Sequence, residues 1–228
     1  MLKRILLSLI LLIGLCGCSS KEPNEKYMVS AIGIEEREEG VCLYYKVTDL
    51  LSSDPSGKTA TMPYFATGGD VSSAAENMSL MLSAEASLSH AEILVLSPKL
   101  DGDTLKDILG FLREKEISLQ MRLSVCEGIS DLFSKENSLS GTDMTGMLHT
   151  TAKTHGFAGH TALFEIETAV KVNSGDFALP YFEKGEENFK ITGLGIYKNC
   201  AFVQKIGVGE SSDYAENKDI EKDEKLWK

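Results

Sequence analysis

Residues 90–125 decide the fold and read HAEILVLSPKLDGDTLKDILGFLREKEISLQMRLSV. Residues 90–97 form a short apolar run that is typical of a buried strand. Asp103 is then expected to cap a helix, whose apolar residues follow the spacing i, i+3, i+4, i+7: Leu105, Ile108, Leu109 and Leu112. Residues 118–125 alternate strictly between apolar and polar side chains, which predicts a second strand. This order predicts a βαβ-like unit, so at least part of the sheet is expected to be parallel.

Upstream of this unit, the sequence predicts a hairpin, a loop and a helix. Residues 28–34 and 41–47 are strand-like and are separated by a charged, turn-like segment. Residues 51–69 are rich in Ser, Gly and Pro, which predicts mostly loop. Asp70 is expected to be the N-cap of a helix that continues to about Ser87. The apolar stripe of this helix comprises Ala74, Ala75, Met78, Met81, Leu82 and Ala86.

Downstream, helices are predicted at residues 129–133, 142–154 and 161–171. Residues 176–180 (DFALP) are interpreted as a rigid turn that enters an edge strand, because proline is restricted in sheet interiors. Residues 189–197 and 201–207 are expected to form a hairpin. Together these elements predict an α/β (mixed α+β) fold with a central mixed β-sheet and flanking helices.

The first twenty residues resemble the signal sequence of a bacterial lipoprotein. Lys3 and Arg4 precede an apolar run at residues 5–13, which is too short to span a membrane, because a span needs about 20 residues. The run ends in the sequence Leu15-Cys16-Gly17-Cys18, which has the pattern of a lipobox. Cys18 is therefore the predicted lipidation site, because only its thiol can accept the diacylglyceryl group. Acyl chains at this position would anchor the protein stably in a lipid bilayer. The alternative is an ordinary signal peptide with two incidental cysteines.

These signals divide the chain into four predicted parts. Residues 1–17 are the lipoprotein signal peptide, and residues 18–26 are a polar tether that could span about 25 Å when extended. Residues 27–209 form the folded domain. Residues 210–228 are strongly charged with almost nothing apolar, which predicts an acidic disordered tail.

Composition and motifs exclude several classes of function. The formal net charge of −11 argues against a nucleic-acid binder, which normally presents a basic patch. The sequence lacks the motifs of phosphate-binding loops, serine hydrolases, zinc proteases and dithiol redox proteins. Cys42, Cys126 and Cys200 are odd in number and are interpreted as small core residues or free thiols. No catalytic residue, cofactor or metal ion is therefore expected.

The four histidines of the chain are candidate site residues. His149, His155 and His160 form the one cluster that suggests a site. Residues six and five positions apart do not lie on the same face of a helix, however. A loop-built metal site would need a fourth ligand such as Asp143 or Glu165. Solvated loop histidines are the preferred interpretation, and a surface metalloenzyme is the competing hypothesis. His90 is interpreted as a capping or core-edge histidine beside a buried strand.

Several segments also follow an order known from one protein family. They are the lipobox at Cys18, residues 32–35 (IGIE), the glycine pair 68–69, residues 87–90 (SLSH) before 93–96 (ILVL), residues 108–118 (ILGFLREKEIS), residues 178–180 (ALP) and residues 191–198 (ITGLGIYK). Over roughly residues 10–210, this order resembles the N-terminal domain of the Ger(x)C family, the lipoprotein C subunits of spore germinant receptors. Ser19-Ser20 stand where the family usually has Trp-Asp. The family continues into a long C-terminal domain, which this chain is expected to lack.

The resemblance implies a non-catalytic lipoprotein at the extracytoplasmic face of the spore inner membrane. Its partners would be polytopic membrane subunits of the germinant receptor, together with the bilayer itself through acylated Cys18. The alternative hypothesis is a substrate-binding lipoprotein of a membrane transporter, although the chain is short for a two-lobed binding protein and aromatic residues make up only 7% of it.

Overall fold

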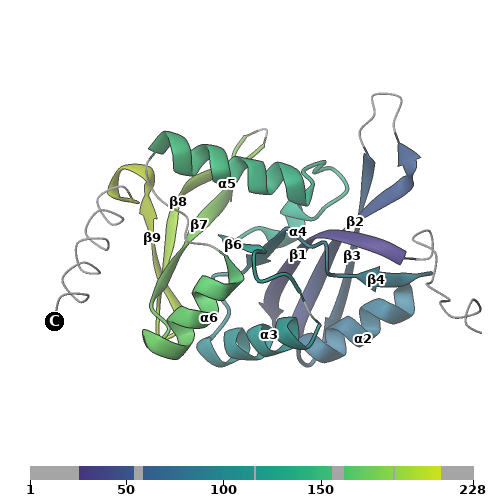
Figure 1. The fold of residues 1–228 in the computed structure, drawn as a ribbon, viewed down its shortest axis with the longest axis horizontal. Helices are drawn as coiled ribbons and strands as arrows, with labels where there is room; N and C mark the ends of the chain where they lie inside the picture. The colour runs from purple at the N-terminus through teal and green to yellow at the C-terminus, as the bar shows by residue number, and fades with distance from the viewer. Residues whose placement is uncertain (1–25, 54–58, 116, 156–161, 187, 212–228) are drawn as a thin grey trace, which may run out of the picture.

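A single mixed β-sheet runs through the computed structural model, which describes residues 26–53, 59–115, 117–155, 162–186 and 188–211 (Figure 1). The strands are β1 (Lys26–Arg37), β2 (Gly40–Ser53), β3 (Thr59–Gly68), β4 (Glu85–Ser87), β5 (Ile93–Leu96), β6 (Arg122–Cys126), β7 (Phe177–Lys184), β8 (Phe189–Lys198) and β9 (Ala201–Gly207). The helices are α2 (Val71–Met81), α3 (Gly102–Glu114), α4 (Ile129–Leu132), α5 (Gly141–His155) and α6 (Leu163–Val172).

The centre of the sheet is parallel and its flanks are antiparallel. The strand order is β3-β2-β1-β5-β6-β7-β8-β9, and the short β4 also pairs with β1. The pairs β1–β5, β5–β6 and β6–β7 are parallel, whereas β3–β2, β2–β1, β7–β8 and β8–β9 are antiparallel. The predicted mixed sheet, its βαβ unit β5–α3–β6 and the hairpins β1–β2 and β8–β9 are therefore confirmed.

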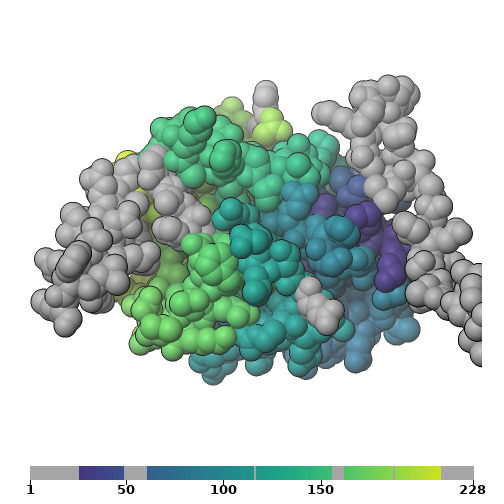
Figure 2. Space-filling view, in the orientation of Figure 1, coloured from purple at the N-terminus to yellow at the C-terminus, as the bar shows by residue number. Residues whose placement is uncertain are grey.

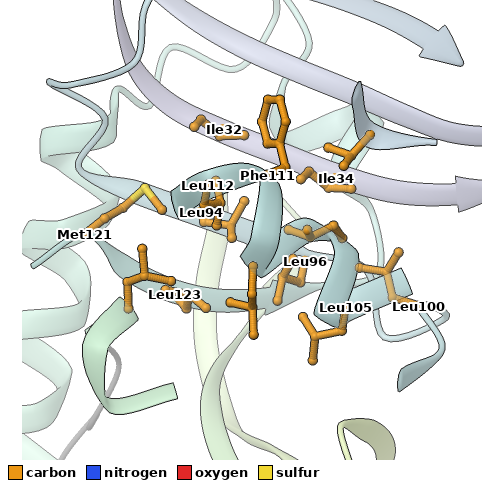
Figure 3. Packing of buried hydrophobic residues seen from close by; sticks show 14 of the residues in the cluster. Ile32, Ile34, Leu94, Leu96, Leu100, Leu105, Phe111, Leu112, Met121 and Leu123 are labelled. Carbon is orange, nitrogen blue, oxygen red and sulfur yellow. The ribbon is translucent and has the colours of Figure 1, made fainter. Parts of the chain in front are cut away.

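Helices cover both faces of the sheet, so the molecule has three layers (Figure 1). Successive side chains of a strand point to opposite faces, so each layer receives its own core. On β5, Leu94 and Leu96 pack with α2, α3 and α6, whereas Ile93 and Val95 pack with α4 and α5. Figure 3 shows the side chains of α3 packed among those of β1, β5 and β6. Each fully buried aliphatic side chain of this kind contributes about 1.5–3 kcal/mol to folding.

Gly33 permits the closest approach between β1 and the second helical layer. A Cβ atom at this position would lie 2.8 Å from the Phe133 ring and 2.9 Å from the side chain of Ile129. Both neighbours are buried, so they cannot move aside without disturbing the core. The glycine therefore lets α4 lie directly on the middle of the sheet.

The prediction of a loop over residues 51–69 is wrong at its beginning, where residues 51–53 continue β2, and over its second half, which forms β3. This strand pairs antiparallel with β2 from Thr59 to Gly68. Pro63 is tolerated because β3 is the edge strand of the sheet, where a missing N–H breaks no pairing. The apolar side chains of Met62, Tyr64 and Ala66 do alternate, but the surrounding Ser, Gly and Pro residues conceal this pattern.

Three predicted boundaries also differ from the structure. Helix α2 ends at Met81, and residues 85–87 form β4 beside β1, because pairing with β1 satisfies their backbone. The N-cap of α3 is Asp101, whose carboxylate accepts hydrogen bonds from the N–H groups of Asp103 and Thr104. Strand β6 begins at Arg122, later than the predicted residue 118. Leu119 therefore lies before the strand and is 53% exposed, although the alternating pattern of residues 118–125 predicts that its side chain is buried.

The predicted turn at residues 176–180 is also wrong. These residues lead directly into β7, which begins at Phe177 and lies between β6 and β8 instead of at the edge. Pro180 is accommodated because β6 pairs only with Tyr181 and Phe182 on this strand. Residues 1–25 and 212–228 lie outside the described residues, so the signal peptide, Cys18 and most of the acidic tail remain predictions.

Candidate functional site

The cysteines of the described residues are core residues without nucleophilic character. Cys42, Cys126 and Cys200 are all free and buried. Burial raises the pKa of all three thiols, and it raises that of Cys126 to about 12. Because the thiolate is the reactive form, these side chains are inert near neutral pH. The prediction that they are small core residues is confirmed.

The histidines do not assemble into a site within the described residues. His149 and His155 are both exposed on α5, so they lie on a helix and not in a loop. His160 lies outside the described residues. Among the residues that the structure does describe, no group of three or more His, Cys, Asp or Glu side chains is placed to hold a metal ion. His90 is exposed before β5, so the core-edge interpretation is wrong.

A buried lysine on β2 is the functional candidate that sequence reasoning missed. Lys46 is only 1% exposed, and its Nζ donates hydrogen bonds to the carbonyl oxygens of Asn137 at 2.8 Å and Leu139 at 2.7 Å. Burial lowers the pKa of Lys46 to about 8, while the carboxylate of Asp143 acts in the opposite direction. The ammonium group also lies 5.8 Å from the centre of the Phe133 ring. Lys46 therefore ties the segment before α5 to the sheet.

A hydrogen-bonded cluster lies at the end of the β1–β2 hairpin. Arg37 donates from Nε to Oε1 of Glu35 at 2.7 Å and from Nη2 to the hydroxyl of Tyr44. That hydroxyl in turn donates to Glu35 Oε1. Burial is the main reason that the pKa of Tyr44 is raised, with contributions from Cys42 and Glu35, so the phenol stays protonated and can donate. The cluster fixes the geometry of the hairpin.

This cluster borders a hollow of about 900 Å³ at the carboxyl ends of β1, β5 and β6. The chain leaves β5 toward α3 on one face and leaves β6 toward α4 on the other face. Such switch points are where open α/β sheets usually bind ligands. The wall carries five carboxylates and two cations: Glu35, Glu36, Glu38, Glu39, Glu127, Arg37 and Lys99. The hollow therefore attracts cations and repels phosphate-bearing ligands.

A second hollow of about 750 Å³ lies between the end of α2 and β4. Its wall combines apolar side chains with two lysines and one glutamate, among them Tyr45, Met78, Phe111, Lys26, Lys115 and Glu85. Figure 2 shows the beginning of β1, in purple, reaching the surface beside the blue side chains of this region. Leu80 and Met81, which lie in sequence between the lining residues Ser79 and Leu82, are large, apolar and exposed. The sequence predicts Met81 in the buried apolar stripe of its helix, but Met81 is the last residue of α2 and its side chain is exposed.

The features of the described residues thus include the two hollows above and the buried Lys46. The family model for the spore germination protein N-terminal domain matches residues 19–184. The chain belongs to this family. The match begins directly after Cys18 and ends at the last residue of β7, so it covers most of the sheet. The resemblance to the Ger(x)C N-terminal domain is confirmed.

Among solved structures, this spore germination domain is similar to a chain described as the GerBC protein. The two chains are 16% identical, with a TM-score of 0.42; the similarity covers 79% of this chain and 52% of the other. The chain thus spans about half the length of that relative. Comparison with curated proteins gives no match. Within the residues that the structure describes, no helix is both long enough and apolar enough to cross a bilayer.

Proposed function

We propose that this chain is the lipid-anchored, non-catalytic C subunit of a spore nutrient germinant receptor. The observation that carries the proposal is the family match over residues 19–184, which begins directly after a lipobox that ends at Cys18. In this role, acylated Cys18 holds the domain at the extracytoplasmic face of the spore inner membrane. The folded domain then docks on polytopic membrane subunits of the receptor.

The proposed mechanism is mechanical coupling, not chemistry. The domain is rigid, because both faces of its sheet are covered by helices with buried apolar contacts. The acyl group sets the height of this rigid body above the bilayer, and its surface meets the loops of the partner subunits. The inert thiols and the solvent-exposed His149 and His155 support a role without catalysis.

A detergent pull-down of the tagged protein from spore inner membranes tests this proposal, with mass spectrometry as the readout. We expect a polytopic subunit and a second membrane subunit to be recovered together with the chain. Recovery of a transporter permease would instead favour the alternative of a substrate-binding lipoprotein. A pull-down that yields no membrane partner would contradict docking, provided that the tagged strain germinates at the normal rate.

A further inference from the structure

Two neighbouring apolar side chains at the end of α2 are largely exposed. Leu80 is 84% exposed and Met81 is 59% exposed. The helix buries other residues, namely Val71, Ala74 and Met78, so its packing against the sheet does not need this pair. Isolated exposed apolar residues are common on protein surfaces, so the pair becomes informative only through its location.

The location is the point where the tether enters the fold. The hydroxyls of Tyr27 and Ser83 are hydrogen bonded at 2.8 Å, and Lys26 Nζ lies 3.8 Å from Glu85 Oε2. In addition, Lys26 and Tyr27 pair with residues of β4 in the sheet. These contacts hold the first residues of β1 against the segment that directly follows Met81. Figure 1 shows the beginning of β1 and the end of α2 at the same end of the molecule.

The length of the tether places this end of the molecule near the bilayer. If Cys18 is acylated at the membrane, the residues between it and Lys26 span about 25 Å when extended. The surface around the beginning of β1 therefore stays within that distance of the lipid headgroups. β9 lies at the far edge of the sheet from the β3–β2–β1 flank.

The local charge also suits a lipid surface better than the charge of the whole chain does. The chain has a net charge of −11, which anionic headgroups repel. The hollow between the end of α2 and β4 instead carries two lysines, Lys26 and Lys115, against one glutamate, Glu85. Lysines in the neighbourhood of exposed apolar side chains are typical of surfaces that lie in the membrane interface. On α2 itself the charged residue one turn before Leu80 is the exposed Glu76, so the lysines of the hollow are the nearby positive charge.

We infer that Leu80 and Met81 insert into the lipid headgroup region and orient the domain on the bilayer. The inference rests on the proposed function, because it requires the anchor at Cys18. The anchor alone would let the domain rotate freely on its tether. Contact through the end of α2 gives the domain one preferred orientation, with the β3–β2–β1 flank near the lipid and β9 away from it.

The test uses the acylated full chain, purified from membranes and reconstituted into phosphatidylglycerol–phosphatidylethanolamine vesicles. Leu80→Cys and Met81→Cys variants are each labelled with a thiol-reactive bimane fluorophore. Val203→Cys on β9 is the matched control, because Val203 is 54% exposed and lies at the opposite edge of the sheet. The three described native thiols are buried, so the added cysteine is labelled selectively.

The readout is quenching of each fluorophore by nitroxide-labelled lipids. We expect loss of fluorescence at positions 80 and 81 and retention at position 203. If the protein floats with the vesicles but neither position 80 nor position 81 is quenched, the proposed orientation is overturned. The proposed anchor at Cys18 is still supported in that case. If the unsubstituted protein does not float with the vesicles, the anchor is overturned, and the orientation with it.

Discussion

Lys46 has a structural role that its position in the sequence does not indicate. In the sequence it occupies a polar position of an alternating strand, which suggests a solvated side chain. The second helical layer covers this face of β2, so the ammonium group is buried and must find acceptors within the protein. It finds two backbone carbonyls, at Asn137 and Leu139. This position could not be recognised from sequence, because the layer that covers it comes from residues about 90 positions later.

Replacing this lysine should destabilise the domain. In Lys46→Met, the carbonyl oxygens of Asn137 and Leu139 lose their buried donor, so we expect the free energy of unfolding at pH 7 to fall by about 1–3 kcal/mol. Chemical denaturation measures this change. Lys153→Met, which removes an exposed lysine of α5, is the control and should leave the stability unchanged. Equal stability of the two variants would show that Lys46 does not hold the segment before α5.

The same lysine gives a pH dependence with a definite sign. The pKa of Lys46 is about 8 in the folded protein, below its ordinary value of 10.5. Between these values the unfolded chain binds more protons, so the contribution of Lys46 to stability rises with pH. Below pH 8 Lys46 is protonated in both the folded and the unfolded chain, so folding bears the full free-energy cost of burying its charge. We therefore expect the stability difference between wild type and Lys46→Met to grow from pH 8 to 10.5 in denaturation experiments. A constant difference would contradict the burial of the charge.

At the scale of elements, β1 and α4 meet through Gly33. Gly33→Ala places a methyl group 2.8 Å from the Phe133 ring, and such overpacking typically costs about 1–3 kcal/mol. Gly110→Ala is the matched control, because no atom lies within 4 Å of a Cβ at this position of α3 and alanine favours helices by about 1 kcal/mol. Thermal unfolding should therefore shift down for the first variant and up for the second. A Gly33→Ala protein as stable as wild type would mean that α4 does not rest on β1.

The elements also show where sequence patterns are informative. The β5–α3–β6 unit was predictable because its apolar spacing is local and is confined to residues 90–125. Strand β3 and the position of β7 were not, because both depend on neighbours distant in sequence. The lipobox alone predicts Cys18 as the lipidation site, and this stays a prediction because Cys18 lies outside the described residues. The exposed pair at the end of α2 was not predictable, because periodicity predicts a helix continuing to residue 87 and only pairing with β1 ends it early.

At the scale of the whole molecule, the proposed anchor at Cys18 would govern whether the domain can act. We expect Cys18→Ala to abolish attachment to spore membranes and to slow germination to the rate of a deletion strain. Membrane fractionation and release of dipicolinate measure the two effects. Cys16→Ala is the matched control, because residue 16 belongs to the predicted signal peptide and is removed with it. A Cys18→Ala protein that stays attached and active would contradict the anchor.

Because β1 pairs in parallel with β5, one edge of β1 stays unpaired while the chain between the two strands is synthesised. β1 can form its hairpin with β2 at once, but its other edge pairs with Ile93–Leu96, which are synthesised only after β2, β3 and α2. Such long-range parallel pairs form slowly, and an unpaired strand edge invites pairing with other chains. The growing chain therefore carries an open edge until Leu96 has been made, and this interval is when misassembly is most frequent.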